Sequence, residues 1–259
     1  MFRESDRQKC ERLLEKYYAG RRFHDSVYRE LIAKHLRPGE RLLDAGCGRY
    51  MQFSKALAAT AHVVGIDLEE TLETHNERAP FGVRGDLNRL PFAAESFDIV
   101  ISRSVVEHLD DPPVVFREFA RVLRPGGKVV IVTPNKYDYV SLIAAVTPFR
   151  VHQLLVSRIF PVSEHDVFPT RYRANTVSAL RRGFRSAGFV ERELRMVNHY
   201  PAYLMFSPVL FRLGILYERL TSQEPLRSLR GSILCVFEKH HAGKLDALDE
   251  HQPAPIGVS

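Results

Sequence analysis

The sequence predicts an α/β fold in which a mainly parallel sheet is covered by helices on both faces. Two observations favour this fold. Short apolar runs that are typical of buried strands recur along the chain, and several of them end in an acid, as at 42–44 and 62–67. Segments with apolar residues at helical spacing separate these runs, so strands and helices alternate. Alternation of this kind calls for parallel strands joined by crossover helices.

The composition is that of one large domain. The chain has 259 residues, 45% of them hydrophobic, which is enough for a substantial core. Its 37 basic and 31 acidic residues leave a net charge of +6, which is spread too thinly to imply a nucleic-acid partner. The cysteines, Cys10, Cys47 and Cys235, are far apart, so we expect neither a metal site nor a disulfide framework. Residues 1–15 lack the apolar core of a secretion signal, and we therefore expect a cytoplasmic protein.

Two helices are expected before the sheet, within residues 1–39. Each has its apolar residues on one face, and the second ends before the sequence Arg37-Pro38-Gly39. The residues of the two faces are Leu13, Leu14, Tyr17 and Tyr18, and then Val27, Tyr28, Leu31 and Ile32.

A glycine turn, Asp44-Ala45-Gly46-Cys47-Gly48, follows the first predicted strand. Glycine lets a backbone turn tightly and approach a ligand without side-chain obstruction. Residues 51–59 are helix-forming, so strand, glycine turn and helix succeed one another as they do in nucleotide sites. An ordinary tight turn would explain the glycines alone equally well.

The next two strands favour the nucleotide site, because they too end in acids. Asp67 stands about twenty residues beyond the glycine turn, the place of a ribose-binding acid in dinucleotide folds. Asp86 could receive an adenine amino group. Each acid could instead cap the helix that follows, since aspartate is a favoured N-cap.

The ensemble of motifs resembles the class I S-adenosylmethionine-dependent methyltransferases, in particular a broad bacterial group with small-molecule or lipid-like acceptors. The motifs lie in the family's order between residues 40 and 135: Asp-Ala-Gly-Cys-Gly at 44–48, Val-Gly-Ile-Asp-Leu at 64–68, Gly-Asp-Leu at 85–87, Leu-Pro-Phe at 90–92, Phe-Asp-Ile-Val at 97–100, Val-Glu-His-Leu at 106–109 and Leu-Arg-Pro-Gly-Gly at 123–127. The resemblance implies S-adenosylmethionine as cofactor. It also implies a Rossmann-like, seven-stranded sheet whose last strand is antiparallel. The apolar insertion that we expect after the fifth strand is this chain's own departure from that pattern.

Carried over from the family, the methionine part of the cofactor would lie against Ala45, Gly46 and Gly48, and Asp44 would support the turn. Many members have a third glycine where this chain has Tyr50. The resemblance therefore defines least well the path of the turn and the residues that would cover the cofactor.

The adenosine part would be held by the next two strand ends. By the same resemblance, Asp67 would take the ribose hydroxyls and Leu68 would pack on the adenine ring. Asp86 and Leu87 would hold the adenine edge.

By the same resemblance, Ser102 or Arg103, at the end of the fourth strand, would lie closest to the amino-acid end of the cofactor and to its methyl group. The sulfonium already activates the methyl group, so the protein needs a general base only if the acceptor must lose a proton. His108 is the first candidate for this catalytic base, because it follows the fourth strand at the edge where open α/β sheets bind ligands. A packing role at the start of a helix is the alternative. Weaker candidates are His165, Asp166, Tyr172, His199 and Tyr200.

Between 136 and 175 the chain departs from the family's compact pattern, and we expect this insertion to select the acceptor. Its apolar residues, 137–160, are interrupted by Pro148, Arg150 and His152, so no membrane span is predicted. The insertion could form a buried acceptor pocket, which we prefer, or an amphipathic surface that touches a bilayer. A second apolar stretch, 200–220, is expected to pack against it.

The remaining elements complete one methyltransferase domain of residues 1–240. Asn175 or Thr176 can cap a helix through Ala187, and 189–197 and 232–237 are predicted to be the last strands. The expected parts are an N-terminal helical cap at 1–39, a cofactor-binding core at 40–135, the insertion at 136–175, the rest of the sheet with a helical insertion at 176–240 and a flexible tail at 241–259.

The sequence thus predicts a cytoplasmic methyltransferase that transfers the methyl group of S-adenosylmethionine to a small or lipid-like acceptor. Oxygen is slightly preferred as the methylated atom, because histidines and tyrosines gather near the expected mouth of the site. A non-catalytic S-adenosylmethionine-binding protein is the first alternative. An NAD-dependent oxidoreductase is less favoured, since its glycine fingerprint is incomplete here. The sequence leaves open the oligomeric state and a peripheral membrane contact.

Overall fold

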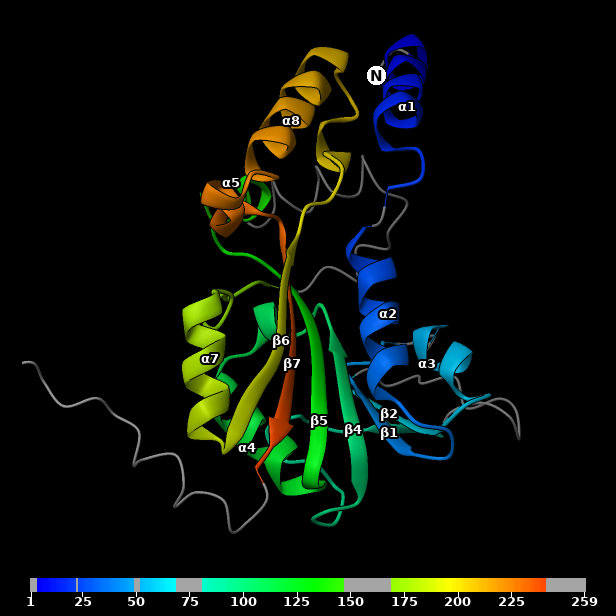
Figure 1. Cartoon of the computed structure of the whole chain (residues 1–259), viewed down its shortest axis with the longest axis vertical. Helices are drawn as coiled ribbons and strands as arrows, with labels where there is room; N and C mark the ends of the chain where they lie inside the picture. Colours follow the sequence, from blue (N-terminus) through cyan, green and yellow to red (C-terminus); the bar gives the residue numbers. More distant parts are fainter. Residues whose placement is uncertain (1–3, 22, 49–51, 69–80, 147–168, 241–259) are drawn as a thin grey trace, which may run out of the picture.

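The computed structural model describes residues 4–21, 23–48, 52–68, 81–146 and 169–240. A seven-stranded sheet of order β3-β2-β1-β4-β5-β7-β6 runs through the molecule (Figure 1). Neighbours from β3 to β5 pair in parallel, and β7 pairs antiparallel with both β5 and β6. This topology confirms the predicted Rossmann-like α/β fold. The strands are β1 (Arg41–Ala45), β2 (His62–Asp67), β3 (Phe81–Arg84), β4 (Phe97–Arg103), β5 (Leu123–Pro134), β6 (Phe189–Val197) and β7 (Ser232–Lys239).

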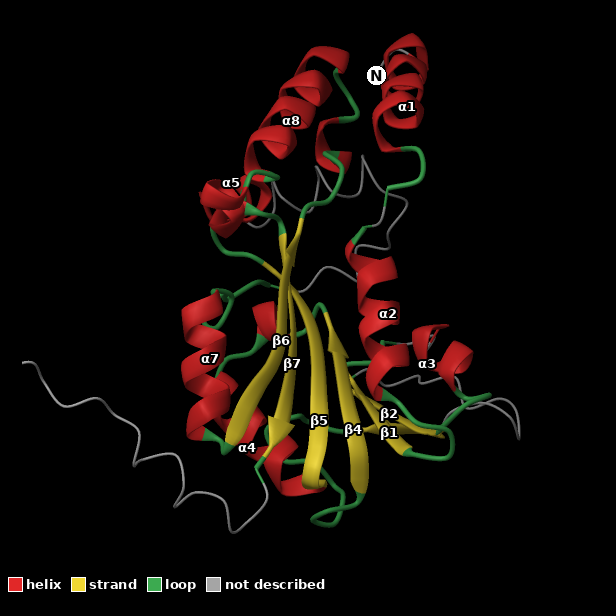
Figure 2. Cartoon of the chain, in the orientation of Figure 1, coloured by secondary structure: helices red, strands yellow, loops and turns green. Residues whose placement is uncertain are grey.

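Helices cover both faces of this sheet (Figure 2). Alternate residues of a strand point to opposite faces, and both faces are apolar here. Leu42 and Ile99 pack with α2 (His24–His35) and α3 (Gln52–Leu57) on one face. Leu43 and Val100 pack with α4 (Pro112–Val122) and α7 (Val177–Ser186) on the other. The near-continuous apolar strands of the sequence reflect this double coverage.

Several local predictions are confirmed residue by residue. The apolar face of α2 is buried as expected, with Val27, Tyr28, Leu31 and Ile32 in the core. Thr176 is the N-cap of α7, and its side chain accepts a hydrogen bond from the N–H of Ala179.

β5 begins earlier than the sequence suggests. The sequence favours a turn at 125–127, between a helix and a strand, but the strand runs from Leu123 to Pro134. The pairing register with β4 shifts between Phe97 and Ile99, where this segment forms an irregularity in the ladder. Gly126 has a φ of 75°, a conformation that glycine adopts at little cost. The glycine signal therefore marks a bulge within the strand.

A second group of helices lies beyond the carboxyl ends of the parallel strands (Figure 1). It contains α1 (Glu4–Tyr18), the short 3-10 helix η3 (Ala202–Leu204), α8 (Pro208–Thr221) and η4 (Glu224–Leu229), with α5 (Tyr139–Val146) between it and the sheet. α1 packs on α8 around a small core of Cys10, Tyr18, Phe211 and Ile215. The hydroxyl of Tyr18 and the guanidinium of Arg21 both donate to the buried carboxylate of Glu218.

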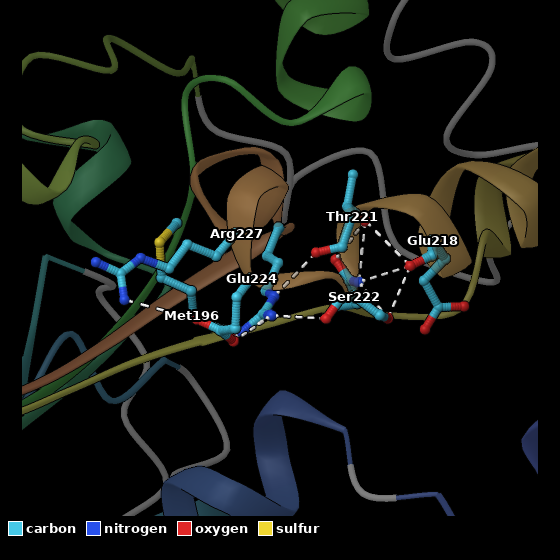
Figure 3. A network of polar contacts seen from close by, with 8 residues as sticks. Met196, Glu218, Thr221, Ser222, Glu224 and Arg227 are labelled. Atoms are coloured by element: carbon cyan, nitrogen blue, oxygen red, sulfur yellow. Dashed lines mark hydrogen bonds and ion pairs between the residues drawn. The ribbon is translucent and has the colours of Figure 1, made fainter.

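Arg230 closes the C-terminal end of α8. Figure 3 shows Thr221, Ser222 and Glu224 at this end. Its guanidinium donates to the carbonyl oxygens of Thr221 and Ser222 at 3.0 and 2.8 Å and to the carboxylate of Glu224 at 2.8 Å. The last carbonyls of a helix lack partners within the helix and carry partial negative charge. A cation placed there stabilises the helix end, so α8 is held firmly at this end.

Several predicted features lie outside the described residues: Tyr50, most of the insertion with His165 and Asp166, and the tail at 241–259. Within the part of the chain that the structure describes, no helix combines the length and the hydropathy of a membrane span.

Candidate active site

The predicted site residues meet at the carboxyl edge of the sheet. β1 to β4 are parallel, so their last residues and the turns that follow face the same side. Figure 1 shows this edge below α5 and α8. In open α/β sheets, ligands bind in the crevice outside these strand ends.

The glycine turn after β1 disfavours larger residues at both of its glycines. Gly46 and Gly48 have φ values of 79° and 67°, which other residues adopt only with strain. A Cβ atom on Gly46 would lie 2.2 Å from Cγ2 of Val105, the residue that precedes the turn after β4. The N–H groups of Gly46 and Cys47 both donate to the carbonyl of Ile66, at 2.8 and 3.2 Å. These two hydrogen bonds fix the turn against the end of β2.

Asp67 links this turn to the next strand. Its carboxylate accepts the N–H of Gly48 at 2.8 Å, and its backbone carbonyl accepts the N–H of Gly85 at 2.9 Å. Its neighbour Leu68 is exposed at the same edge. The last residue of β2 therefore holds together the two segments that the resemblance assigns to the cofactor.

Asp86 forms a local turn after β3. One of its carboxylate oxygens, Oδ1, accepts the backbone N–H and the side-chain amide of Asn88, at 2.9 and 2.8 Å. This is the Asx-turn geometry that aspartate favours, in place of the helix cap considered above. The carboxyl group is exposed, whereas Leu87 is buried in the main core.

Buried polar groups close the end of β4. Asp44 and Ser102 are both buried, and the hydroxyl of Ser102 donates to the carbonyl of Ala45 at 3.1 Å. Ser102 therefore joins the ends of β4 and β1. The guanidinium of Arg103 lies 3.3 Å from the carboxylate of Asp25 at the start of α2.

His108 ends the single turn η1 (Val106–His108) that follows β4. Its Nδ1 lies 3.0 Å from the carbonyl oxygen of Pro169. A carbonyl can only accept, so Nδ1 carries the hydrogen in this contact. In the neutral ring, Nε2 then keeps the lone pair and can accept a proton.

Sequence reasoning missed Glu107, the neighbour of His108. Glu107 is buried, and its carboxyl accepts the hydroxyl of Thr133 at 2.9 Å. Thr133 accepts in turn from the amide of Asn175 at 2.6 Å. The backbone carbonyl of Glu107 accepts the N–H groups of Arg171 and Tyr172, at 2.6 and 3.1 Å. Burial raises the pKa of Glu107. The signal for this residue was an acid among apolar neighbours, directly after a buried strand.

A second buried cluster lies between β5 and α8. Asp138, Tyr139, His199 and Tyr217 line a narrow gap in which no water-sized sphere fits. Asp138 accepts the N–H of Val140 at 3.1 Å and lies 3.7 Å from Nε2 of His199. Burial raises the pKa of Asp138 to about 6 and lowers that of His199 to about 4. Both groups are therefore neutral between these values, and their contact there is not an ion pair.

The other weak candidates that the structure describes lie in different parts of the molecule. Tyr172 lies beside Glu107, as described, but Tyr200 packs edge-on against the ring of Phe23 with centroids 5.3 Å apart. Tyr200 is thus part of the junction between the helical group and α2. Among the described residues, no cluster of three or more His, Cys, Asp and Glu side chains could hold a metal ion.

Solved structures with similar folds support the topology. A putative sarcosine dimethylglycine methyltransferase from Galdieria sulphuraria superposes with a TM-score of 0.54 at 16% identity, covering 90% of this chain and 98% of that one. The [4+2]-cyclase SpnF superposes with a TM-score of 0.56 at 18% identity, and the match covers 86% of each chain. A geranyl diphosphate methyltransferase, solved in complex with GPP and sinefungin, gives 0.55 at 17% identity and 83% and 77% of the chains. At these identities the likeness shows the fold.

Sequence relatives include both an O-methyltransferase and an N-methyltransferase. Malonyl-[acyl-carrier protein] O-methyltransferase of Erwinia pyrifoliae is 40% identical over 110 residues, 40% of this chain and 42% of that protein. Phosphoethanolamine N-methyltransferase 1 of Arabidopsis thaliana is 35% identical over 112 residues, 40% of this chain and 23% of that protein. Both matches thus span less than half of the relative's length.

Two further comparisons identify the family. The family model described as a methyltransferase domain matches residues 43–131. A probable S-adenosylmethionine-dependent methyltransferase of Mycolicibacterium smegmatis is 31% identical over 187 residues, which are 71% of this chain and 69% of that protein. With this similarity over more than two thirds of both proteins, and with the sheet topology described above, the chain belongs to the class I S-adenosylmethionine-dependent methyltransferases.

Proposed function

We propose that this methyltransferase acts on a hydroxyl group of a small or lipid-like acceptor, and that His108 is the base that takes the acceptor's proton. The observation that carries this proposal is the contact between Nδ1 of His108 and the carbonyl of Pro169 at 3.0 Å. It orients the ring and directs proton acceptance to Nε2. Further support is the position of η1 directly after β4, at the ligand-binding edge of the sheet.

The residues at this edge fit the cofactor of the family. The turn is open at Gly48, where an added Cβ atom would meet nothing within 4 Å, and the carboxylate of Asp67 lies beside it. The exposed Leu68 can cover a flat ring. When bound, the cofactor supplies a methyl group that its sulfonium has already activated. In this proposal the cofactor-binding residues are Asp44, Ala45, Gly46, Gly48, Asp67, Leu68, Asp86, Leu87, Ser102 and Arg103.

The chain's own tasks are then to position the acceptor, to exclude water and to remove one proton. A neutral amine can attack a methyl group without prior loss of a proton, whereas a hydroxyl is a weak nucleophile until its proton leaves. A histidine oriented to accept a proton therefore favours an oxygen acceptor. Relatives that methylate oxygen and relatives that methylate nitrogen both resemble this chain, so the family alone does not decide the atom.

The proposed division of the chain keeps residues 40–135 as the cofactor-binding core and 136–175 as the acceptor-side insertion. The short distance between Nδ1 of His108 and Pro169 supports this division, because Pro169 belongs to the insertion. A cytoplasmic location stays a prediction.

The test compares acceptors that share a carbon skeleton and differ in the terminal group: a hydroxyl, an amine or a carboxylate. His108→Asn is the decisive variant, because its amide can still donate to Pro169 while no base remains. We expect hydroxyl methylation to fall by about 10²–10⁴ in kcat. Affinity for S-adenosylhomocysteine should stay at the wild-type value.

Three outcomes would contradict this assignment. Faster turnover of the amine, unaffected by His108→Asn, would indicate nitrogen transfer. An equal loss of turnover and cofactor affinity would make His108 structural. Tight binding of S-adenosylhomocysteine with no transfer to any acceptor would favour a non-catalytic cofactor-binding protein.

A further inference from the structure

α8 carries an apolar stripe on the side that faces away from its own core. Successive residues of a helix are about 100° apart, so positions 209, 213, 216 and 220 fall within an arc of about 60°. Their side chains are exposed, at 64% for Val209, 55% for Leu213, 53% for Leu216 and 46% for Leu220. We call these four residues the α8 stripe.

The core of the helical group does not use this stripe. The buried residues of α8 include Phe211, Ile215 and Glu218, which lie on the opposite side of the helix. Phe211 and Ile215 pack with α1, and Glu218 accepts from Tyr18. α8 is therefore anchored without the stripe. Single exposed leucines are common on protein surfaces, but four large aliphatic side chains in one row mark an interaction surface.

The charges beside the stripe are positive. α8 contains three charged residues, Arg212, Glu218 and Arg219. Glu218 is buried and accepts hydrogen bonds from Tyr18 and Arg21, so the two arginines are the charged side chains that α8 itself exposes. Both arginines are exposed, and their positions fall on one flank of the stripe, about 70–90° from its centre. On this flank the guanidinium of Arg219 lies over the ring of Tyr17 in α1. A helix that exposes an aliphatic stripe with arginines along one flank is suited to bind the surface of an anionic lipid bilayer.

We propose that the α8 stripe docks on the surface of an anionic phospholipid bilayer, with Arg212 and Arg219 at the level of the phosphates. A protein partner would be expected to meet aromatic and hydrogen-bonding side chains, which protein interfaces favour, but the stripe is purely aliphatic. Long arginine side chains can lie along the apolar surface and place their charge in the headgroup layer. The helix, 14 residues and thus about 21 Å long, would lie along the bilayer surface.

Docking by α8 would bring the active site to its acceptor. Figure 1 shows α8 beyond the carboxyl edge of the sheet, on the same side as the turns that follow β1 and β4. A lipid-like acceptor held in the bilayer would then approach the edge that carries His108. This part of the inference rests on the proposed function, whereas the docking itself does not.

The test is sedimentation of the purified full chain with two kinds of vesicle. One kind is phosphatidylcholine alone, and the other contains about 30% phosphatidylglycerol. We expect binding to the anionic vesicles that weakens as salt rises, because the arginine contribution is screened. The double variant Leu213→Ser/Leu216→Ser should lose at least about tenfold in vesicle affinity, and Arg212→Gln/Arg219→Gln should lose the preference for anionic lipid.

Phe81→Ser is the matched control, because Phe81 is an exposed apolar residue of β3 at the far edge of the sheet. It should bind vesicles like the wild type. Affinity for S-adenosylhomocysteine, measured on every variant, reports that the fold is intact. If Leu213→Ser/Leu216→Ser is misfolded, Arg212→Gln/Arg219→Gln tests the docking by itself.

The docking proposal is overturned if anionic vesicles bind no better than neutral ones, or if binding survives both double variants. A dimer that the serine substitutions dissociate would overturn it as well, since the stripe would then join two copies. Vesicle binding without methyl transfer would refute the proposed function but not the docking. Methyl transfer to a dissolved hydroxyl acceptor without vesicle binding would refute the docking alone.

Discussion

The N–H of Gly48 donates to the carboxylate of Asp67 at 2.8 Å, so the acid expected to bind the ribose also holds the glycine turn. Replacing Asp67 therefore affects the cofactor site in two ways. Asp67→Asn retains an oxygen that can accept from Gly48 but loses the charge. Asp67→Ala loses both.

We expect Asp67→Asn to weaken S-adenosylhomocysteine about tenfold and Asp67→Ala about a hundredfold, because a hydrogen bond to a charged group contributes about 1.5–3 kcal/mol. Calorimetric titration measures both. Asp6→Asn, an exposed acid of α1, is the control. Unchanged affinity in Asp67→Ala would remove this residue from the site.

Gly46→Ala should disrupt the same turn by collision with Val105. Gly39 offers a matched control, because it has a φ of 80° but nothing within 4 Å of the place that a Cβ atom would occupy, whereas the Cβ at Gly46 would lie 2.2 Å from Val105. The left-handed conformation alone costs about 1–2 kcal/mol, which both substitutions share.

We expect Gly46→Ala to lower the free energy of unfolding by about 1–3 kcal/mol more than Gly39→Ala, the usual range for overpacking. Urea denaturation measures the difference. The double variant Gly46→Ala/Val105→Ala should recover part of it. Equal losses at the two glycines would show that Val105 moves aside freely.

Thr133→Val tests the buried network around Glu107. The substitution keeps the volume but removes the hydroxyl that donates to Glu107 and accepts from Asn175. A buried polar group left without its partner costs about 1–3 kcal/mol, and two groups lose a partner here. We therefore expect at least this loss in urea denaturation.

The matched substitution is Thr176→Val, which removes a hydroxyl at the exposed cap of α7 and should cost about 1 kcal/mol. If Thr133→Val were no more destabilising than this cap variant, the network would not be important for stability.

The pH dependence of stability should change when Asp138 or His199 is replaced. Burial raises the pKa of Asp138 from 3.8 to about 6, so the folded protein retains a proton there that the unfolded chain has lost. This contribution to stability is complete below pH 3.8 and is lost as the pH rises to 6. Burial lowers the pKa of His199 from 6.5 to about 4, and its contribution grows as the pH rises from 4 to 6.5.

In the wild type the two trends oppose each other between pH 4 and 6. The stability of Asp138→Asn should therefore rise more steeply with pH over this window than that of the wild type. The stability of His199→Gln should rise less steeply than that of the wild type. Urea midpoints at four pH values measure these slopes. Asparagine can still cap α5, so the helix start is kept. Three parallel curves would mean that neither group titrates abnormally.

The sheet was predictable because its signals are local. β6 runs from Phe189 to Val197 as expected, since the helix before it has a capping Thr176 and ends at a glycine. The buried face of α2 followed from helical spacing alone. Asp67 ends β2 as expected, whereas β3 ends at Arg84, two residues before Asp86.

Burial that depends on distant residues was not predictable. A glutamate is mostly exposed, but Glu107 is buried with a partner from a distant part of the chain, Thr133, whose hydroxyl in turn accepts from Asn175. The residues of α8 are apolar on both sides, so the sequence could not say which side meets the core. The role of the two glycines in β5 depends on the register with β4.

The position of β7 between β5 and β6 has a consequence for synthesis on the ribosome. Translation delivers β1 to β5 early, and β6 later, but among the described strands β6 pairs with β7 alone, whose residues are 232–239. Until these residues leave the exit tunnel, the open edge of β5 and the apolar faces beside it stay exposed to the cytosol of the producing cell. A nascent chain that pauses before residue 232 is therefore the species that molecular chaperones should bind most strongly.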